Sequence, residues 1–377
     1  MMDTLFEPVN IGKLTLKNRA VRSATWTGMA HKDGRCSSRL IALTERLAKG
    51  EVGLIITGFA YVMPNGQALA DQLGIHKDDM IPSFSKLTRR VHESGGTIAM
   101  QIAHAGVQTT LRPDNDRPVW GPSAVFDDTF KKTPKAMTQR EIKRVIVAFA
   151  DAAGRAKRAG FDAVQLHAAH GYLVSQFLSP STNIRTDIYG GSIENRGRFL
   201  FQTFRAVRKA VGKDFPVLVK LNGKDFRHRG LTLKDALFVA GELDRMGIDA
   251  IEVSGGTPAS GPLGPARPDI GTAESEAYFM PLAKEIRKQV TAPVAVVGGI
   301  RSLETVQTVF DSKSASLVSF SRPLIREPDL VKRWKAGDRR KAECISCNLC
   351  FRAARSRDGV YCMARKRSRK RVTASSE

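Results

Sequence analysis

The chain has 377 residues, 42% of them hydrophobic, which is enough to build a substantial core. No apolar run approaches the ~20 residues of a membrane-spanning helix, and the first residues show no secretory signal, so we expect a cytoplasmic protein. The net charge of +23 favours anionic partners such as phosphorylated cofactors. We interpret the excess of basic residues as a feature that favours solubility rather than as a sign of nucleic-acid binding.

Eight short runs rich in apolar and β-branched residues predict buried strands, with segments of helical character between them. In chain order the runs occupy residues 18–25, 52–62, 96–104, 161–169, 216–222, 248–256, 293–300 and 316–324. The clearest helix lies at 140–160, where apolar positions recur on one face and Gly160 ends the pattern. The long stretches 105–135 and 170–195 are expected to be loops.

Regular alternation of strands and helices predicts a parallel (β/α)₈ barrel of the TIM type. A doubly wound sheet is the alternative, but the first strand–helix turn carries no GxGxxG motif. We therefore expect a barrel over residues 1–337, a short cysteine-rich extension over 338–364 and a basic, disordered tail over 365–377. Active sites of such barrels lie at the mouth formed by the C-terminal ends of the strands.

Two histidines and a tyrosine mark the end of the fourth predicted strand: His167 lies at its end, His170 and Tyr172 follow in its loop, and all three should lie at this mouth. A zinc site would need a third ligand, and no HExxH motif is present. A purely structural role, with both imidazoles bonded to backbone, stays open. Neutral imidazoles can also donate hydrogen bonds to a carbonyl oxygen on which charge develops, and a nearby phenol can supply a proton.

The stretch HAAHGYLVSQFLSPSTNIRTDIYGGSIENRGRF, which starts at His167, resembles the signature of the old yellow enzyme family of flavin oxidoreductases. The segments LFEPVNIGKLTLKNRAVRSA, DQLGIHKDD, QIAHAG and SRPLIREPDL extend the resemblance over about residues 3–335. It implies an FMN-binding (β/α)₈ barrel that NAD(P)H reduces, which agrees with the strand count.

The resemblance also implies roles for single residues. His167 and His170 would bind the activating carbonyl of the substrate, and Tyr172 would donate a proton. Lys220 would stabilise the negative charge of reduced flavin near N1 and O2, although an ion pair inside the barrel is the alternative for this residue. The other implied flavin contacts are Gln101 at the pyrimidine edge, Ser23, Ala24, Thr25 and Trp26 beside the ring, and Gly58 beneath it.

The flavin phosphate is expected at the last two strands, where Gly298 and Gly299 permit close backbone approach and Ser321 and Arg322 add donors. The sequence departs from the family in three places. Trp26 stands where relatives often carry Cys or Thr, Val107 where Arg is common, and Ser321 where Gly is common. These changes put the redox tuning and the pocket shape in question.

Four of the five cysteines, Cys344, Cys347, Cys350 and Cys362, form a C-x2-C-x2-C-x11-C pattern. This spacing predicts a [4Fe-4S] cluster, with zinc or unmetallated thiols as alternatives. It resembles the region after the barrel in the branch of trimethylamine dehydrogenase and 2,4-dienoyl-CoA reductase. A cluster here would exchange electrons with an external partner. Cys36 is expected to be an ordinary small residue.

We expect an enzyme that reduces the C=C bond of an enone or enoyl substrate by hydride transfer from reduced FMN. An amine dehydrogenase or demethylase of the trimethylamine dehydrogenase branch is the alternative. A tRNA dihydrouridine synthase would suit the positive charge, but such enzymes use an active-site cysteine, and only Cys36 is a candidate here. The substrate, the choice of NADH or NADPH and the formation of a homo-oligomer remain open.

Overall fold

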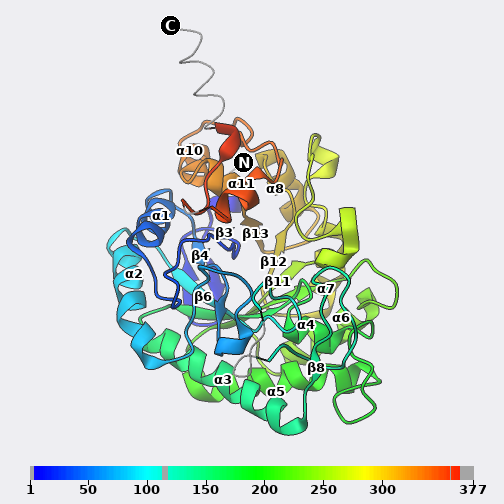
Figure 1. Cartoon of the computed structure of the whole chain (residues 1–377). Helices are drawn as coiled ribbons and strands as arrows, with labels where there is room; N and C mark the ends of the chain where they lie inside the picture. The colour runs from blue at the N-terminus through cyan, green and yellow to red at the C-terminus, as the bar shows by residue number, and fades with distance from the viewer. Residues whose placement is uncertain (1–3, 113–117, 357, 366–377) are drawn as a thin grey trace, which may run out of the picture.

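The structure is a computed structural model that describes residues 4–112, 118–356 and 358–365, and it shows a closed parallel barrel ringed by helices (Figure 1). The ring closes because β13 pairs with β3 and β4 pairs with β6. The predicted (β/α)₈ fold is therefore confirmed, with every barrel strand inside its predicted run. These strands are β3 (Ala20–Arg22), β4 (Leu54–Ile56), β6 (Ile98–Ala103), β9 (Ala163–Ala168), β10 (Val217–Asn222), β11 (Ala250–Ser254), β12 (Val294–Val297) and β13 (Leu317–Phe320).

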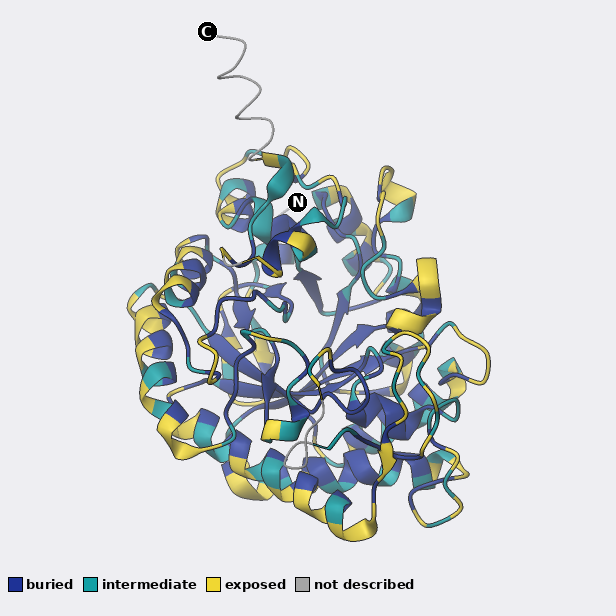
Figure 2. Cartoon of the chain, in the orientation of Figure 1, coloured by how far each residue is buried: buried dark blue, intermediate teal, exposed yellow. Residues whose placement is uncertain are grey.

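Amphipathic helices cover the outside of the barrel and turn their buried faces toward the strands (Figure 2). The predicted helix at 140–160 is α3, which begins with a capping box between Thr138 and Glu141 and buries Val145 and Phe149. The other covering helices are α1 (Ser38–Lys49), α2 (Ile81–Glu93), α5 (Ile193–Val211), α6 (Leu233–Arg245), α7 (Met280–Gln289) and α8 (Leu303–Asp311).

The barrel interior changes from apolar to polar along its axis. At the N-terminal end, Leu218 and Ala250 pack with Ile11 and Leu16 of the hairpin β1 (Val9–Ile11) and β2 (Leu14–Leu16), which closes this end. Inward-facing positions recur every second residue of a strand. Two residues toward the mouth, the inward positions of β10 and β11 are accordingly Lys220 and Glu252, so a polar layer lies above the apolar plug.

The segments expected to be loops are only partly irregular. The first contains β7 (Trp120–Gly121), which pairs with β8 (Lys135–Ala136) just beyond it. The second, residues 170–195, contains α4 (Leu173–Leu178), and its last residues already belong to α5, which begins at Ile193. All six residues of α4 are buried, so packing against the barrel supports a helix too short to be stable by itself.

The cysteine-rich extension packs directly on the barrel. It contains α11 (Leu349–Ala354), which follows α9 (Arg322–Arg326) and α10 (Leu330–Lys335). The backbone N–H of Val360 donates to the carbonyl oxygen of Thr27 at 2.7 Å. The expected disordered tail falls almost entirely on residues 366–377, which lie outside the described residues. None of the helices within the described ranges is long and apolar enough to cross a membrane.

Candidate active site

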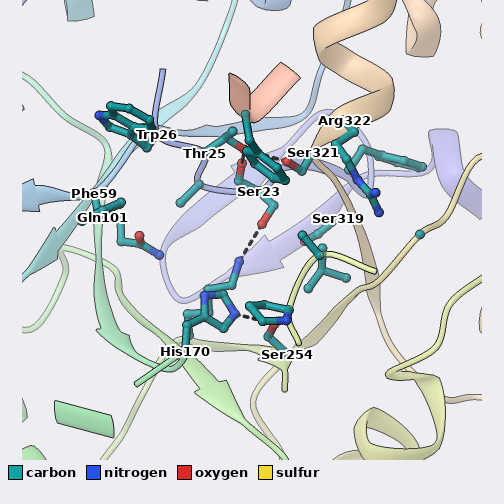
Figure 3. Close-up of a pocket in the computed structure, with 18 of the residues that line it drawn as sticks. Ser23, Thr25, Trp26, Phe59, Gln101, His170, Ser254, Ser319, Ser321 and Arg322 are labelled. Atoms are coloured by element: carbon teal, nitrogen blue, oxygen red, sulfur yellow. Dashed lines mark hydrogen bonds between the residues drawn. The ribbon is translucent and has the colours of Figure 1, made fainter. Parts of the chain in front are cut away.

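A cavity of about 300 Å³ opens at the C-terminal ends of the barrel strands (Figure 3). Phe59, Ser254 and Ser319 line it together with most of the side chains that the sequence marked as functional. The predicted residues that it brings together are Ser23, Ala24, Thr25, Trp26, Gln101, His167, His170, Tyr172, Lys220, Gly299, Ser321 and Arg322.

Two predicted flavin residues lie outside this lining. Gly58 packs behind Thr25, where an added Cβ would come within 2.8 Å of the Thr25 carbonyl oxygen. Gly298 adopts φ +135°, and an added Cβ would approach the ring of Tyr278 to 3.1 Å. At both positions the neighbouring atoms that would crowd a side chain belong to the protein, so their contact with a flavin stays a prediction.

A network of buried hydrogen bonds, which we call the polar floor, joins Ser23, Gln101, Gln165, Lys220 and Glu252. Lys220 Nζ donates to Ser23 Oγ at 2.6 Å, the bond drawn in Figure 3, and to Glu252 Oε1 at 3.1 Å. Gln165 Nε2 donates to Glu252 Oε2 at 2.9 Å, and Gln101 Nε2 donates to Gln165 Oε1 at 2.7 Å. The network thus joins four strands of the barrel, β6, β9, β10 and β11, to the residue that follows β3.

The polar floor holds a buried ion pair. Lys220 is 3% exposed and Glu252 is 2% exposed, so neither charge is solvated by bulk water. Burial opposes ionisation of Glu252, but the charge of Lys220 and hydrogen bonds from Ser23, Gln165 and Lys220 together keep its pKa below the usual value. Lys220 therefore both pairs with Glu252 and lines the cavity, and the two interpretations of this lysine are compatible.

The two histidines of the site are neutral. Burial and the charge of Lys220 hold the pKa of His167 well below its ordinary range; burial, His167 and Lys220 do the same for His170. His167 Nδ1 accepts from the backbone of Ala169 at 3.4 Å, which leaves the proton on Nε2. His170 Nε2 bonds to Ser254 Oγ at 2.7 Å (Figure 3). Each ring can therefore direct one N–H into the cavity.

Tyr172 lies against the same histidine. Its ring centroid is 4.7 Å from that of His167 and 4.9 Å from that of Phe59. Burial raises the pKa of the phenol above its ordinary value, so it stays protonated at neutral pH. His167 at the end of β9 and His170 and Tyr172 in the loop after it thus converge above the polar floor.

The lining of the cavity carries hydrogen-bond donors without partners. Within the described part of the chain, Trp26 Nε1, Ser319 Oγ and Arg301 Nη2 are buried and unpaired, and all three residues line the cavity. Buried polar groups are normally paired, so these atoms suit a bound polar molecule. Ser321 Oγ and Thr25 Oγ1 lie 2.8 Å apart, and both residues line the cavity. The donor set therefore fits a phosphorylated flavin.

Comparison with known proteins decides the family. Residues 4–341 match the NADH:flavin oxidoreductase / NADH oxidase family. An NADPH dehydrogenase of Bacillus velezensis is 38% identical over 333 residues, which cover 88% of this chain and 94% of that protein. The chain belongs to this family. It is thus an FMN-dependent NAD(P)H oxidoreductase by class, as the resemblance implied.

Longer members of the family match the chain over about half their length. An NADH oxidase of Thermoanaerobacter brockii is 39% identical over 349 residues, covering 92% of this chain and 53% of that protein. A structure of 2-naphthoyl-CoA reductase with 2-naphthoyl-CoA gives a TM-score of 0.85 at 27% identity, over 91% of this chain and 54% of that one. The structure of histamine dehydrogenase from Rhizobium sp. 4-9 gives a TM-score of 0.80 at 26% identity, over 89% of this chain and 48% of that one.

Morphinone reductase in complex with tetrahydroNAD is a shorter relative. It gives a TM-score of 0.75 at 28% identity, over 89% of this chain and 91% of that one. The flavin oxidoreductase barrel is therefore shared with structures of both lengths.

The flavin oxidoreductase site includes residues that the sequence did not point to. Ser346, Phe351 and Arg355 of the extension line the cavity. Arg322 Nη1 donates to Asn348 Oδ1 at 2.7 Å and to the Ser346 carbonyl oxygen at 3.1 Å. The extension is thus a wall of the cavity. The sequence does not mark Phe351 and Arg355 as lining residues, because the cysteine spacing around them indicates only a metal site.

The cysteines show no assembled metal site. Among the described residues, no group of three or more His, Cys, Asp or Glu side chains is placed to hold a metal ion. The cysteines of the extension are nevertheless close enough to affect one another: burial, helped by Cys344 and Cys347, raises the pKa of Cys350 to about 11. The predicted [4Fe-4S] cluster is therefore not confirmed.

Cys36 lies apart from this group and from the cavity lining. Burial alone raises the pKa of its thiol to about 12, so the thiol is a poor proton donor. This agrees with the interpretation of Cys36 as an ordinary buried residue.

Proposed function

We propose that the enzyme reduces the C=C bond of an α,β-unsaturated carbonyl compound. The observation that carries the proposal is the convergence of His167, His170 and Tyr172 above the polar floor. When bound, FMN would supply the hydride, and NAD(P)H would be its source. The pyrimidine edge of the flavin would face Gln101 and Lys220, and its phosphate would face Gly299, Ser321 and Arg322.

Residues of the chain would bind the substrate carbonyl and supply the proton. His167 Nε2 and His170 Nδ1 would donate to the substrate carbonyl oxygen, where negative charge develops as the β-carbon is attacked. Neutral donors suit this role because their N–H groups are already in place. Tyr172 Oη would hold the proton that the α-carbon receives.

An assay of paired substrates tests this function. We expect NAD(P)H-dependent consumption of a simple enone such as 2-cyclohexenone, and His170→Ala should weaken the binding of phenols, measured by the change in flavin absorbance. Oxidation of amines with no consumption of enones would reject the proposal in favour of the amine dehydrogenase branch. That branch has support in the TM-score of 0.80 with histamine dehydrogenase.

For the extension, we propose a [4Fe-4S] cluster held by Cys344, Cys347, Cys350 and Cys362, which would serve an external electron-transfer partner. The spacing supports it, and Arg326 Nη1 lies 3.6 Å from Cys362 Sγ, a cation suited to an anionic ligand set. About four iron and four sulfide per chain are expected after anaerobic purification. One zinc without sulfide would show a structural zinc site instead.

A further inference from the structure

Two members of the polar floor lie beneath the cavity and do not reach it. Ser23, Gln101 and Lys220 line the cavity, whereas Gln165 and Glu252 are absent from its described lining. Gln165 and Glu252 are 0% and 2% exposed. A molecule bound in the cavity would therefore not contact Glu252 directly, and the residues above Glu252 would lie between the two.

The position of the Glu252 carboxylate is fixed from both sides. Oε1 accepts from Lys220 at 3.1 Å, and Oε2 accepts from Gln165 at 2.9 Å. Gln165 is held in turn by Gln101, its partner in the pairing of β6 with β9. Lys220 and Glu252 are themselves register partners in β10 and β11. Strand pairing and hydrogen bonds thus place this carboxylate beside the ammonium.

Glu252 compensates the charge of Lys220. Around the ammonium, β11 provides the Glu252 carboxylate, β9 provides His167, the loop after β9 provides His170, and the residue after β3 provides the Ser23 hydroxyl. Both histidines are neutral and supply no charge that could balance that of Lys220. An isolated charge is costly to bury, and the carboxylate is the anion that pairs with this buried ammonium at 3.1 Å.

We propose that Glu252 is a positioning residue that keeps the Lys220 ammonium charged and directed at the cavity before the flavin is reduced. This inference rests on the proposed function, which places the pyrimidine edge of FMN beside Lys220. A cation already in place stabilises the negative charge that reduction brings. The polar floor then needs to take up no proton during reduction.

The variant Glu252→Gln tests this role because it keeps the shape of the side chain and removes its charge. Lys220 would then be neutral beside oxidised flavin and would take a proton from solvent as the flavin is reduced. The reduction potential should depend on pH more steeply than in the wild type, by up to one proton per electron pair. The double variant Lys220→Met/Glu252→Gln should return to the wild-type slope, because it has no amine to titrate.

Glu327→Gln is the matched control. Glu327 is 8% exposed and pairs with Arg333 at 2.9 Å, but it lies outside the cavity lining. Its variant should keep the wild-type slope. An unchanged slope in Glu252→Gln with FMN bound overturns the role of Glu252, whereas a wild-type protein that binds no FMN overturns the proposed function itself.

A measurement on the wild type covers the case in which Glu252→Gln does not fold. The infrared difference between reduced and oxidised holoenzyme should show no new protonated-carboxyl band, because Glu252 stays ionised beside Lys220. Appearance of such a band would mean that the pair takes up a proton on reduction, and this would overturn the inference.

Discussion

At the scale of single residues, one lysine organises the charges of the site. Lys220 holds the pKa of Glu252 below its usual value, and it helps to hold the pKa values of His167 and His170 below theirs. The same cation therefore keeps a carboxylate ionised and two imidazoles neutral. A cavity with neutral donors above and a compensated cation beneath suits chemistry in which negative charge appears only during reaction.

Tyr172→Phe isolates the proton-transfer step at this scale. Because only the hydroxyl is lost, FMN binding, its reduction by NAD(P)H and the binding of phenols should stay near wild type. Reduction of an enone should slow by ~10²–10⁴, the usual contribution of a positioned general acid. Stopped-flow measurement of the two half-reactions separates these effects. Enone reduction at the wild-type rate would mean that solvent or another residue supplies the proton.

At the scale of elements, the extension and the barrel mouth form one structure. Arg301 Nη1 donates to the Cys344 carbonyl oxygen at 2.7 Å, and Arg322 bonds to Ser346 and Asn348. Both arginines follow strands whose ends are the predicted phosphate site. Displacement of the extension should therefore disturb flavin binding as well as the cysteines.

A pair of glycine variants tests this coupling. Gly28 and Gly247 both adopt positive φ, +63° and +82°, so alanine should cost each position about 1–2 kcal/mol in backbone strain. A Cβ on Gly28 would also collide with the Ala354 carbonyl oxygen of the extension, whereas nothing lies within 4 Å of a Cβ on Gly247. Titration with FMN should show at least about tenfold weaker binding for Gly28→Ala alone, equivalent to about 1.4 kcal/mol. Equal affinities in both variants would show that the extension does not support the flavin site.

The barrel could be predicted from the sequence because its strands are continuous apolar runs between helical segments. The mouth was less predictable, since α4 forms through burial rather than through a pattern of its own. Lys220 attracted attention as a charge in an apolar strand, and Glu252 offers the same signal in IDAIEVS. No motif marks Glu252, however, and its pairing with Lys220 depends on strand register. Contacts such as Phe351 with the cavity depend on tertiary packing, which spacing does not encode.

At the scale of the whole molecule, the two ends of the barrel differ: apolar packing that stabilises the fold lies at one end, and the candidate active site lies at the other. The hairpin β1–β2 and the apolar layer close one end, and polar, strongly buried groups fill the other. Histidines at the functional end must stay neutral in the folded state although they can protonate freely when the chain unfolds. The arrangement of the site therefore has a consequence for the stability of the entire fold.

Mild acid should destabilise the protein through these histidines. Burial lowers the pKa of His104 to about 3 and holds that of His167 well below 6.5, and their exposures are 1% and 3%. Both folded-state values lie below the unfolded value, so below pH 6.5 the unfolded chain binds more protons and the free energy of unfolding falls as the pH falls. Each of these two histidines should cost about 1.4 kcal/mol between pH 7.5 and 5.5, or about 3 kcal/mol together, and His170, whose pKa burial also holds well below its ordinary range, should add to the loss.

Urea denaturation of FMN-saturated protein at the two pH values measures this change, in a window above the titration of ordinary carboxylates. His104→Asn provides the internal comparison, because an amide oxygen can still accept from the Gly106 N–H, which donates to His104 Nδ1 at 3.1 Å. Its loss of stability between pH 7.5 and 5.5 should be smaller than that of the wild type by about 1.4 kcal/mol. The same loss in both proteins would mean that His104 binds its proton in the folded state, and that the acid sensitivity has another source.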